Sequence, residues 1–244
     1  AYWPMFEPRI PGFSHIPSPY PYFYKAPEGA ASQGIAAADE LEKAILQTGP
    51  ENVAAFVAEP VVLGGMAIGV PPPDYFPRIR EICDKYDVLF IADEVITGFG
   101  RTGKLFAIEH WDAVPDMIVF AKGISSGYIP LGGVLFQDAI RQVLNSADGG
   151  LPHVFTSVNH PVAMRVASTV LDIIEEEGIL ENARDVGDYL LKRALELRKY
   201  PMVGDIRGKG LMLGMELVRD RETKQPFEAS LGVHKRIRRI LLEK

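Results

Sequence analysis

The sequence has little cysteine, no long apolar run and no excess of basic charge. Its one cysteine, Cys83, cannot form an internal disulfide, which excludes a disulfide scaffold and fits a reducing, cytoplasmic location. No stretch of about 18 consecutive apolar residues occurs, so we expect no membrane-spanning helix. The first residues lack the basic segment and apolar core of a signal peptide. The net charge of −6 disfavours nucleic acid as the main partner.

The composition is that of a folded globular chain. Of the 244 residues, 47% are hydrophobic and 24% are charged, which excludes a disordered or collagen-like protein. The chain does not begin with Met, and it ends inside the helical pattern RIRRILLEK without a capping residue. We therefore expect it to be part of a longer protein.

Residues 1–30 form a segment rich in proline and aromatic residues. The prolines exclude a helix or a central strand. The aromatic side chains, among them Trp3, Phe6, Phe13 and Phe23, are too many to lie in solvent. Two interpretations remain equally open: an irregular arm packed on a partner subunit, or a loop folded on its own domain.

Residues 31–160 alternate between helical and strand patterns. Helical spacing covers residues 36–47 and 74–86, and Asp74 is placed to cap the second helix. Short apolar runs predict buried strands at residues 53–58, 88–92, 117–120 and 133–136. Such strands alternating with helices predict a parallel sheet covered on both faces, in which ligands bind outside the carboxyl ends of the strands.

The rest of the chain is predicted to be mainly helical and then mixed. Residues 161–200 read as connecting helices, with Asn159 as a possible cap. Residues 201–244 read as part of a small C-terminal domain, with a strand pair and then a helix from Ala229. The basic cluster on that helix is interpreted as a solvated face rather than a nucleic-acid patch; it consists of Lys235, Arg236, Arg238 and Arg239.

Charged side chains follow three of the predicted strands. Glu59 follows the first, Asp93 and Glu94 the second, and Lys122 the third. Because the carboxyl ends of parallel strands share one edge, these groups are expected to meet there. One interpretation is a partly exposed salt bridge. The other is a lysine made nucleophilic by desolvation beside an acid aimed at a cofactor.

Pyridoxal phosphate (PLP) requires such a pair. Its aldehyde forms a Schiff base with a lysine, and a carboxylate keeps its pyridine nitrogen protonated. Other chemistries have weaker signals. The five histidines show no metal-ligand spacing, so no metal is expected, and no Walker or Rossmann glycine pattern follows an early strand.

Two long segments resemble the signature of the class III PLP-dependent aminotransferases. They are FIADEVITGFGRTG at residues 90–103 and PDMIVFAKG at residues 115–123. Shorter matches at residues 58–60, 155–156, 160–163 and 207–210 extend the resemblance over most of the chain. The resemblance implies PLP-dependent transferase fold type I: a mainly parallel sheet sandwiched by helices, followed by part of a smaller α+β domain.

The resemblance also implies roles for individual residues. Lys122 matches the Schiff-base lysine, which also moves the proton between the substrate α-carbon and the cofactor. Asp93 matches the partner of the pyridinium nitrogen, and Val95 matches the residue that packs on the ring. Glu59 matches a glutamate that supports the cofactor pocket. Thr156 matches a phosphate-binding threonine that reaches the neighbouring subunit's cofactor, which implies a homodimer.

Departures from the family pattern bear on the substrate. Ile96 stands where some subfamilies have Gln, and Gly64 stands where some have a Glu that switches a substrate-binding arginine. Both differences point toward the ω-amino acid–pyruvate branch. The family's phosphate loop and stacking aromatic would precede residue 1, and its carboxylate-binding arginine would follow residue 244. Arg207 is expected to brace the small domain.

The sequence therefore predicts transfer of an amino group from an ω-amine or ω-amino acid to a small 2-oxo acid, with pyruvate as the expected acceptor, through a Schiff base on Lys122. Two alternatives within the fold are an aminomutase and a non-catalytic relative. A nucleotide-binding oxidoreductase is disfavoured, because no glycine-rich turn follows an early strand.

Overall fold

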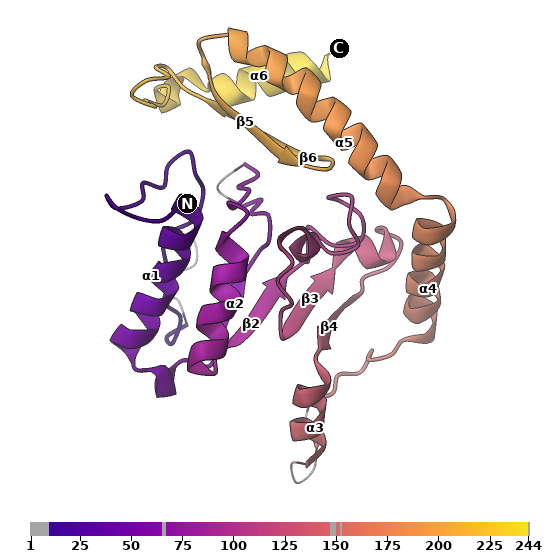
Figure 1. The fold of residues 1–244 in the computed structure, drawn as a ribbon. Helices are drawn as coiled ribbons and strands as arrows, with labels where there is room; N and C mark the ends of the chain where they lie inside the picture. The colour runs from indigo at the N-terminus through magenta and orange to yellow at the C-terminus, as the bar shows by residue number, and fades with distance from the viewer. Residues whose placement is uncertain (1–9, 65–66, 147–149, 152, 244) are drawn as a thin grey trace.

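The computed structural model describes residues 10–64, 67–146, 150–151 and 153–243. These residues form two β-sheets and a series of helices (Figure 1). None of the helices in these ranges has the length and apolar character needed to cross a bilayer.

The larger sheet has four strands in the order β1-β2-β3-β4. The strands are β1 (Ala55–Ala58), β2 (Leu89–Asp93), β3 (Met117–Ala121) and β4 (Gly132–Phe136). The first three run parallel, as predicted, but β4 pairs antiparallel with β3. The reason is the short connection, residues 122–131, which holds only the 3₁₀ turn η4 (Lys122–Ser125). A parallel return needs a crossover of a dozen or more residues.

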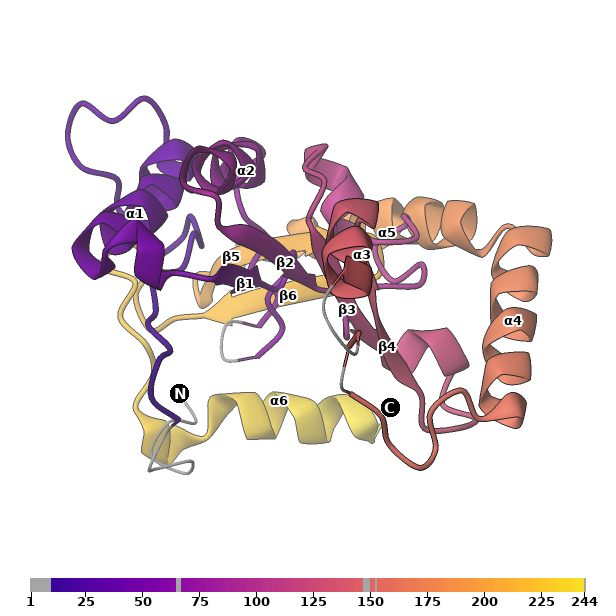
Figure 2. The ribbon, with the colours of Figure 1, turned by 90° about the horizontal axis from the view of Figure 1, so that it is seen from below.

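Two helices cover one face of this sheet, as Figure 2 shows. They are α1 (Gln33–Thr48) and α2 (Tyr75–Tyr86), which pack against each other, and α2 contacts β2. Buried side chains of both helices share one core cluster with Phe90 and Ala92 of β2. The Phe76 ring of α2 stacks on Phe90 of β2 with centroids 5.8 Å apart. Cys83 is buried on the same helix, as expected of a core residue.

The opposite face of the sheet is open in the described part of the chain. Val57 and Leu89 are exposed there, and so are Val134 and Phe136 of β4. The predicted helical cover on both faces is therefore present on one face only. Because paired residues of neighbouring strands point to the same side, Asp93, opposite Val119, lies on this open face.

The starts of α1 and α2 are tied to each other. The Ser32 hydroxyl accepts a hydrogen bond from the Ile35 N–H at 3.0 Å and so caps α1. The same hydroxyl donates to the Asp74 carboxylate. Asp74 is at the N-cap position of α2, but its side chain makes no capping hydrogen bond there. The predicted Asp74 cap is thus wrong in its contact, because the carboxylate is engaged by the neighbouring helix.

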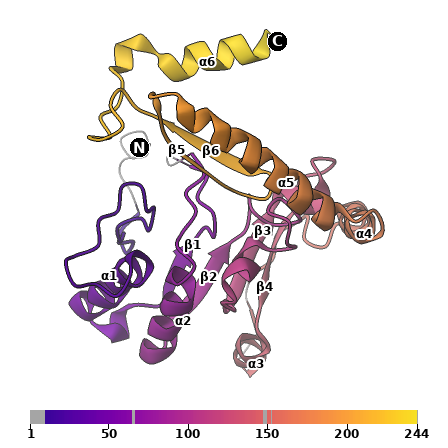
Figure 3. The same cartoon turned by 45° about the horizontal axis from the view of Figure 1, so that its top comes forward.

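The second half of the chain holds long helices and a two-stranded sheet (Figure 3). Its elements are α3 (Asp138–Ser146), α4 (Pro161–Glu176), α5 (Ile179–Leu195), β5 (Val203–Lys209), β6 (Met212–Leu217) and α6 (Val233–Leu242). The β5–β6 pair is antiparallel, as predicted. The N-cap of α4 is His160, and Asn159 precedes it in a left-handed conformation (φ 53°), so the predicted Asn159 cap is wrong. The four basic residues of α6 are exposed, as expected.

The proline-rich arm packs on its own chain from Tyr20 onward. The buried Tyr20 hydroxyl donates to the Asp205 carboxylate at 3.1 Å, and the Arg207 guanidinium lies 4.2 Å from the centre of the Tyr20 ring. Ile10 and Phe13 are exposed. Of the two interpretations of the arm, a loop folded on its own chain holds for this part. Trp3 and Phe6 lie outside the described residues.

Candidate active site

The carboxyl edge of the larger sheet brings together the residues singled out in the sequence. Glu59 follows β1, Asp93 ends β2 and Lys122 follows β3. Asp93 pairs in register with Val119, so Lys122 begins three positions farther along the neighbouring strand. At about 3.3 Å per residue, this places the Lys122 backbone roughly 10 Å beyond that of Asp93.

The Asp93 side chain is fixed by the turn that follows it. Its Oδ1 accepts a hydrogen bond from the Val95 N–H at 3.1 Å. Asp93 and Val95 are both half-buried. The carboxylate is therefore held by its own backbone on the open face of the sheet, with an apolar side chain two residues away.

Lys122 lies at a sharp turn of the backbone. Its φ is +47°, in the left-handed region that residues with a Cβ seldom adopt. The residue is exposed, so the described part of the chain does not supply the predicted desolvation of its amine. A left-handed φ at a residue with a Cβ places local backbone strain at this strand end.

The pKa of the Glu59 carboxyl depends on the charges of both Asp93 and Lys122. The Glu59 carboxylate accepts a hydrogen bond from the Leu63 N–H at 3.3 Å. Burial raises the pKa of Glu59 above its usual value and the Leu63 N–H lowers it; the Asp93 charge raises it and the Lys122 ammonium lowers it to smaller extents. Glu59 thus lies within electrostatic range of both Asp93 and Lys122.

Glu94 does not join this cluster. Its side chain is fully buried, accepting hydrogen bonds from the Thr97 hydroxyl and, at 2.8 Å, from the Ile108 N–H. Burial raises the pKa of Glu94. The sequence analysis placed Glu94 at the sheet edge beside Asp93. Successive side chains along a strand point to opposite faces of the sheet, and this alternation is the sequence signal that places Glu94 on the other face from Asp93.

Thr156 lies in an exposed turn before α4, and α4 packs against η4, the turn that begins with Lys122. Its predicted contact with the cofactor of a neighbouring subunit remains a prediction. Arg207 has the bracing contacts expected of it. It donates to the carbonyls of Ala67 and Ile68, both at 2.8 Å, and forms an ion pair with Asp205 at 3.2 Å.

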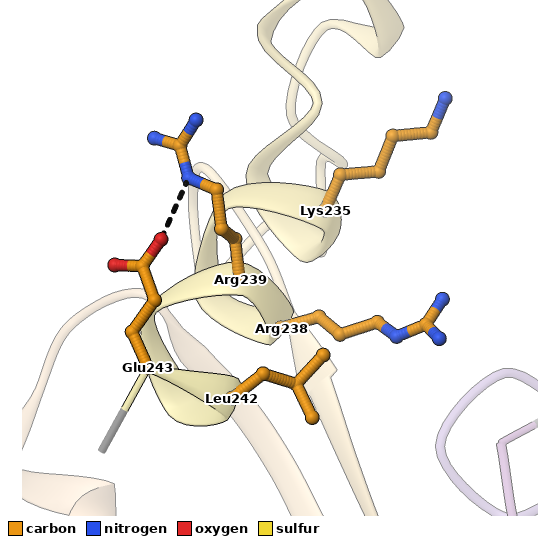
Figure 4. A pocket seen from close by; sticks show the side chains of 5 residues that line it. All are labelled: Lys235, Arg238, Arg239, Leu242 and Glu243. Carbon is orange, nitrogen blue, oxygen red and sulfur yellow. Dashed lines mark ion pairs between the residues drawn. The ribbon is translucent and has the colours of Figure 1, made fainter.

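A hollow on the surface lies elsewhere, on α6 (Figure 4). Four side chains of that helix and Glu243, the residue that follows it, line the hollow, and Arg239 and Glu243 form an ion pair there at 3.9 Å. None of the predicted site residues contributes to this hollow. Across the described ranges, no three His, Cys, Asp or Glu side chains are grouped so that they could hold a metal ion.

Comparison with known proteins gives matches along nearly the whole chain. The family profile "Aminotransferase class-III" matches residues 1–239. The putrescine–pyruvate aminotransferase of Pseudomonas aeruginosa is 48% identical over 219 residues, which are 89% of this chain and 48% of that protein. The taurine–pyruvate aminotransferase of Bilophila wadsworthia is 40% identical over 234 residues, 93% of this chain and 51% of that protein.

Solved structures agree with the sequence matches. An (S)-enantioselective ω-transaminase from Thermomicrobium roseum has a TM-score of 0.87 at 47% identity, over 94% of this chain and 51% of that one. A transaminase from an ancestral-reconstruction study has a TM-score of 0.90 at 41% identity, over 98% of this chain and 53% of that one. The chain spans about half the length of these relatives. The fold is that of PLP-dependent enzymes of fold type I, and the chain belongs to the class III aminotransferase family.

Proposed function

We propose that the complete protein carrying this chain transfers an amino group from an ω-amine or ω-amino acid to a small 2-oxo acid, using PLP held by Lys122 and Asp93. The observation that carries the proposal is the pairing of an exposed lysine and a fixed carboxylate at the carboxyl ends of adjacent parallel strands. Enzymes of this family depend on PLP. When bound, PLP supplies an aromatic ring that accepts the electron pair left on the substrate carbon when its proton departs.

The residues present suit that cofactor. The Val95 N–H holds the Asp93 carboxylate at 3.1 Å, and its other oxygen accepts no hydrogen bond from the described residues, so it would be able to keep a proton on the ring nitrogen of a bound cofactor. The Lys122 amine, on a flexible four-carbon chain, is able to carry the cofactor and then to move a proton to and from the substrate α-carbon. Val95 offers an apolar surface to one side of the ring. Glu59 adds a carboxylate beside both groups.

The proposed substrates follow from two positions and from the relatives. Ile96 has no side-chain group that could form a hydrogen bond with the cofactor. A Cβ on Gly64 would meet nothing within 4 Å, so packing does not explain why this chain has glycine where some subfamilies have glutamate. Two relatives are named as aminotransferases that use pyruvate, one with putrescine and one with taurine. We therefore propose an ω-amine donor and pyruvate as acceptor. The exposed Thr156 fits a homodimer in which it reaches the partner's cofactor phosphate.

The test uses the complete protein loaded with PLP. Adding an ω-amine alone is expected to bleach the visible absorbance of the bound cofactor, and pyruvate is expected to restore it. Lys122→Ala removes the amine that attaches the cofactor, so borohydride treatment should no longer link PLP to the protein. Lys192→Ala, at an exposed position of α5, serves as the control and should behave like the wild type.

Two outcomes would overturn the proposal. One is a wild-type protein that binds no PLP. The other is a Lys122→Ala protein that still becomes covalently labelled and turns over at the wild-type rate. Turnover of an amine without any added oxo acid would indicate an aminomutase instead.

A further inference from the structure

The buried carboxylate of Glu94 costs folding free energy that packing of the fold does not explain. The carboxylate is fully buried, and no ion pair involves it within the described part of the chain. Burying a carboxylate without a cation is unfavourable, and an apolar side chain of similar size would normally fit a core at lower cost. A buried acid directly after Asp93 therefore calls for a reason other than packing.

Its hydrogen bonds join the two ends of one segment. Glu94 accepts from the Thr97 hydroxyl at the start of the segment and from the Ile108 N–H, at 2.8 Å, near its end. Its own N–H donates to the Val119 carbonyl of β3 at 2.9 Å, and its carbonyl accepts from the Gly98 N–H at 3.0 Å. Residues 94–108 thus form a closed loop that is anchored to both β2 and β3. We call this segment the Glu94 loop.

The Glu94 loop also supports the turn that carries Lys122. A Cβ on Gly123 would lie 3.0 Å from the Phe99 Cβ and 3.1 Å from the Gly98 carbonyl oxygen, so the loop and the turn are in close backbone contact. The Phe99 ring packs edge-on against Phe120, with centroids 5.6 Å apart. A displacement of the loop at residues 98–99 would therefore disturb the residues on both sides of Lys122, Phe120 and Gly123.

Through these contacts the Glu94 loop touches the surroundings of both Asp93 and Lys122. At its start it fixes Asp93, because the Val95 N–H that orients the Asp93 carboxylate belongs to the loop. Along its middle it fixes the Lys122 turn. We infer that Glu94 is a positioning residue that holds Asp93 and Lys122 in the mutual geometry the cofactor needs. This inference rests on the proposed function at those two residues.

The test is a comparison of Glu94 variants in the complete protein loaded with PLP. Glu94→Ala removes both hydrogen bonds and should lower kcat by about tenfold to a hundredfold, the usual cost of a small misplacement at a reacting centre. The pH midpoint of the visible absorbance of the bound cofactor should also shift, by about half a pH unit or more, because a displacement of nearby charged groups changes the pKa of a bound group. Glu94→Gln keeps an acceptor for the Ile108 N–H and should restore most of both properties.

Two further variants make the test specific. Thr97→Val removes one donor to Glu94 at nearly constant volume, and it should shift the pH midpoint in the same direction by a smaller amount. It carries the test if Glu94→Ala does not fold. Asp116→Ala is the matched control. Asp116 accepts the Phe90 N–H and pairs with Arg80, both at 2.7 Å, at the other end of β3. That variant should lose stability without moving the midpoint.

The outcomes separate this inference from the proposed function. If the wild type neither binds PLP nor transfers an amino group, the proposed function fails. If the wild type does both, and Glu94→Ala and Thr97→Val leave the pH midpoint where the wild type has it, the positioning role of Glu94 is wrong. A midpoint shift of equal size in Asp116→Ala would also overturn it, because general destabilisation would then explain the effect.

Discussion

Neighbouring residues at the end of β2 have opposite environments. Asp93 lies on the open face of the sheet, while Glu94 is enclosed beneath the loop that follows it. The sequence could predict Asp93 and Lys122 as a pair, because each follows an apolar run. It could not predict how buried each side chain is, because burial depends on segments that are distant in sequence, such as residue 108 closing over Glu94.

A pH dependence of stability follows from Glu94. Its pKa in the folded protein is raised above the ordinary value of 4.5, so the folded state favours the protonated form. The stabilisation from that proton is complete below pH 4.5 and is lost as the pH rises through the folded-state pKa. Glu94→Gln has no such proton to lose. We expect the Tm of Glu94→Gln, relative to the wild type, to increase as the pH is raised.

The measurement is thermal unfolding of both cofactor-free proteins from about pH 4 to about pH 8. A difference in Tm that stays constant over this range would contradict the assignment of a raised pKa to Glu94.

At the scale of elements, three backbones meet without side chains between them. A Cβ on Gly187 of α5 would lie 2.3 Å from the Gly210 carbonyl carbon, in the turn between β5 and β6. A Cβ on Gly210 would in turn lie 2.4 Å from the Thr102 carbonyl carbon. The helix, the hairpin turn and the loop after Asp93 are thus in direct contact, so the β5–β6 pair is held close to the candidate site.

Gly187→Ala should therefore destabilise the protein although alanine is the better helix former. Helix propensity alone would favour alanine by about 1 kcal/mol. The clash with Gly210 outweighs this, and we expect a net loss of about 1–3 kcal/mol, the usual cost of overpacking. Urea unfolding measures the change. Lys192→Ala, on an exposed position of the same helix, is the control, and a stabilised Gly187→Ala protein would show that the contact is absent.

Sequence patterns identify these elements better than their pairing. The apolar runs predict all four strands of the larger sheet to within one or two residues. The direction of β4 was missed because the pattern of an apolar strand is the same in either direction, and only the length of the connection distinguishes them. The caps predicted at Asp74 and Asn159 were wrong because a side chain of capping type can instead bond to a neighbouring element, as Asp74 does, or lie one residue outside the N-cap position, as Asn159 does.

At the scale of the whole molecule, Arg207 joins three distant parts of the chain. It contacts the Tyr20 ring of the arm, the carbonyls of Ala67 and Ile68, and the carboxylate of Asp205 on its own strand. The sequence indicated that the arm needs a surface. It could not indicate which one, because a proline-rich segment has no periodicity that marks a buried side.

Arg207→Ala should cost about 3 kcal/mol of folding free energy, because it takes the guanidinium away from the partly buried Asp205 carboxylate, which keeps only the Tyr20 hydroxyl and the more distant Arg198, and leaves two carbonyl groups without their donor. Arg207→Lys should recover little of this, since an ammonium cannot reproduce the planar, forked contacts. Urea unfolding measures both. Arg193→Ala, which breaks an exposed pair with Glu196, is the control and should change stability by less than about 1 kcal/mol.

The left-handed backbone at Lys122 has a consequence for folding. At φ +47°, glycine is free of the steric cost that any residue with a Cβ bears. The free energy of unfolding of Lys122→Gly should therefore exceed that of Lys122→Ala by about 1 kcal/mol, although both variants lack the amine. Urea unfolding measures the difference as a higher midpoint for Lys122→Gly. The chain thus carries a lysine where its own folding would favour glycine, and the role proposed for the Lys122 amine would account for that loss of stability.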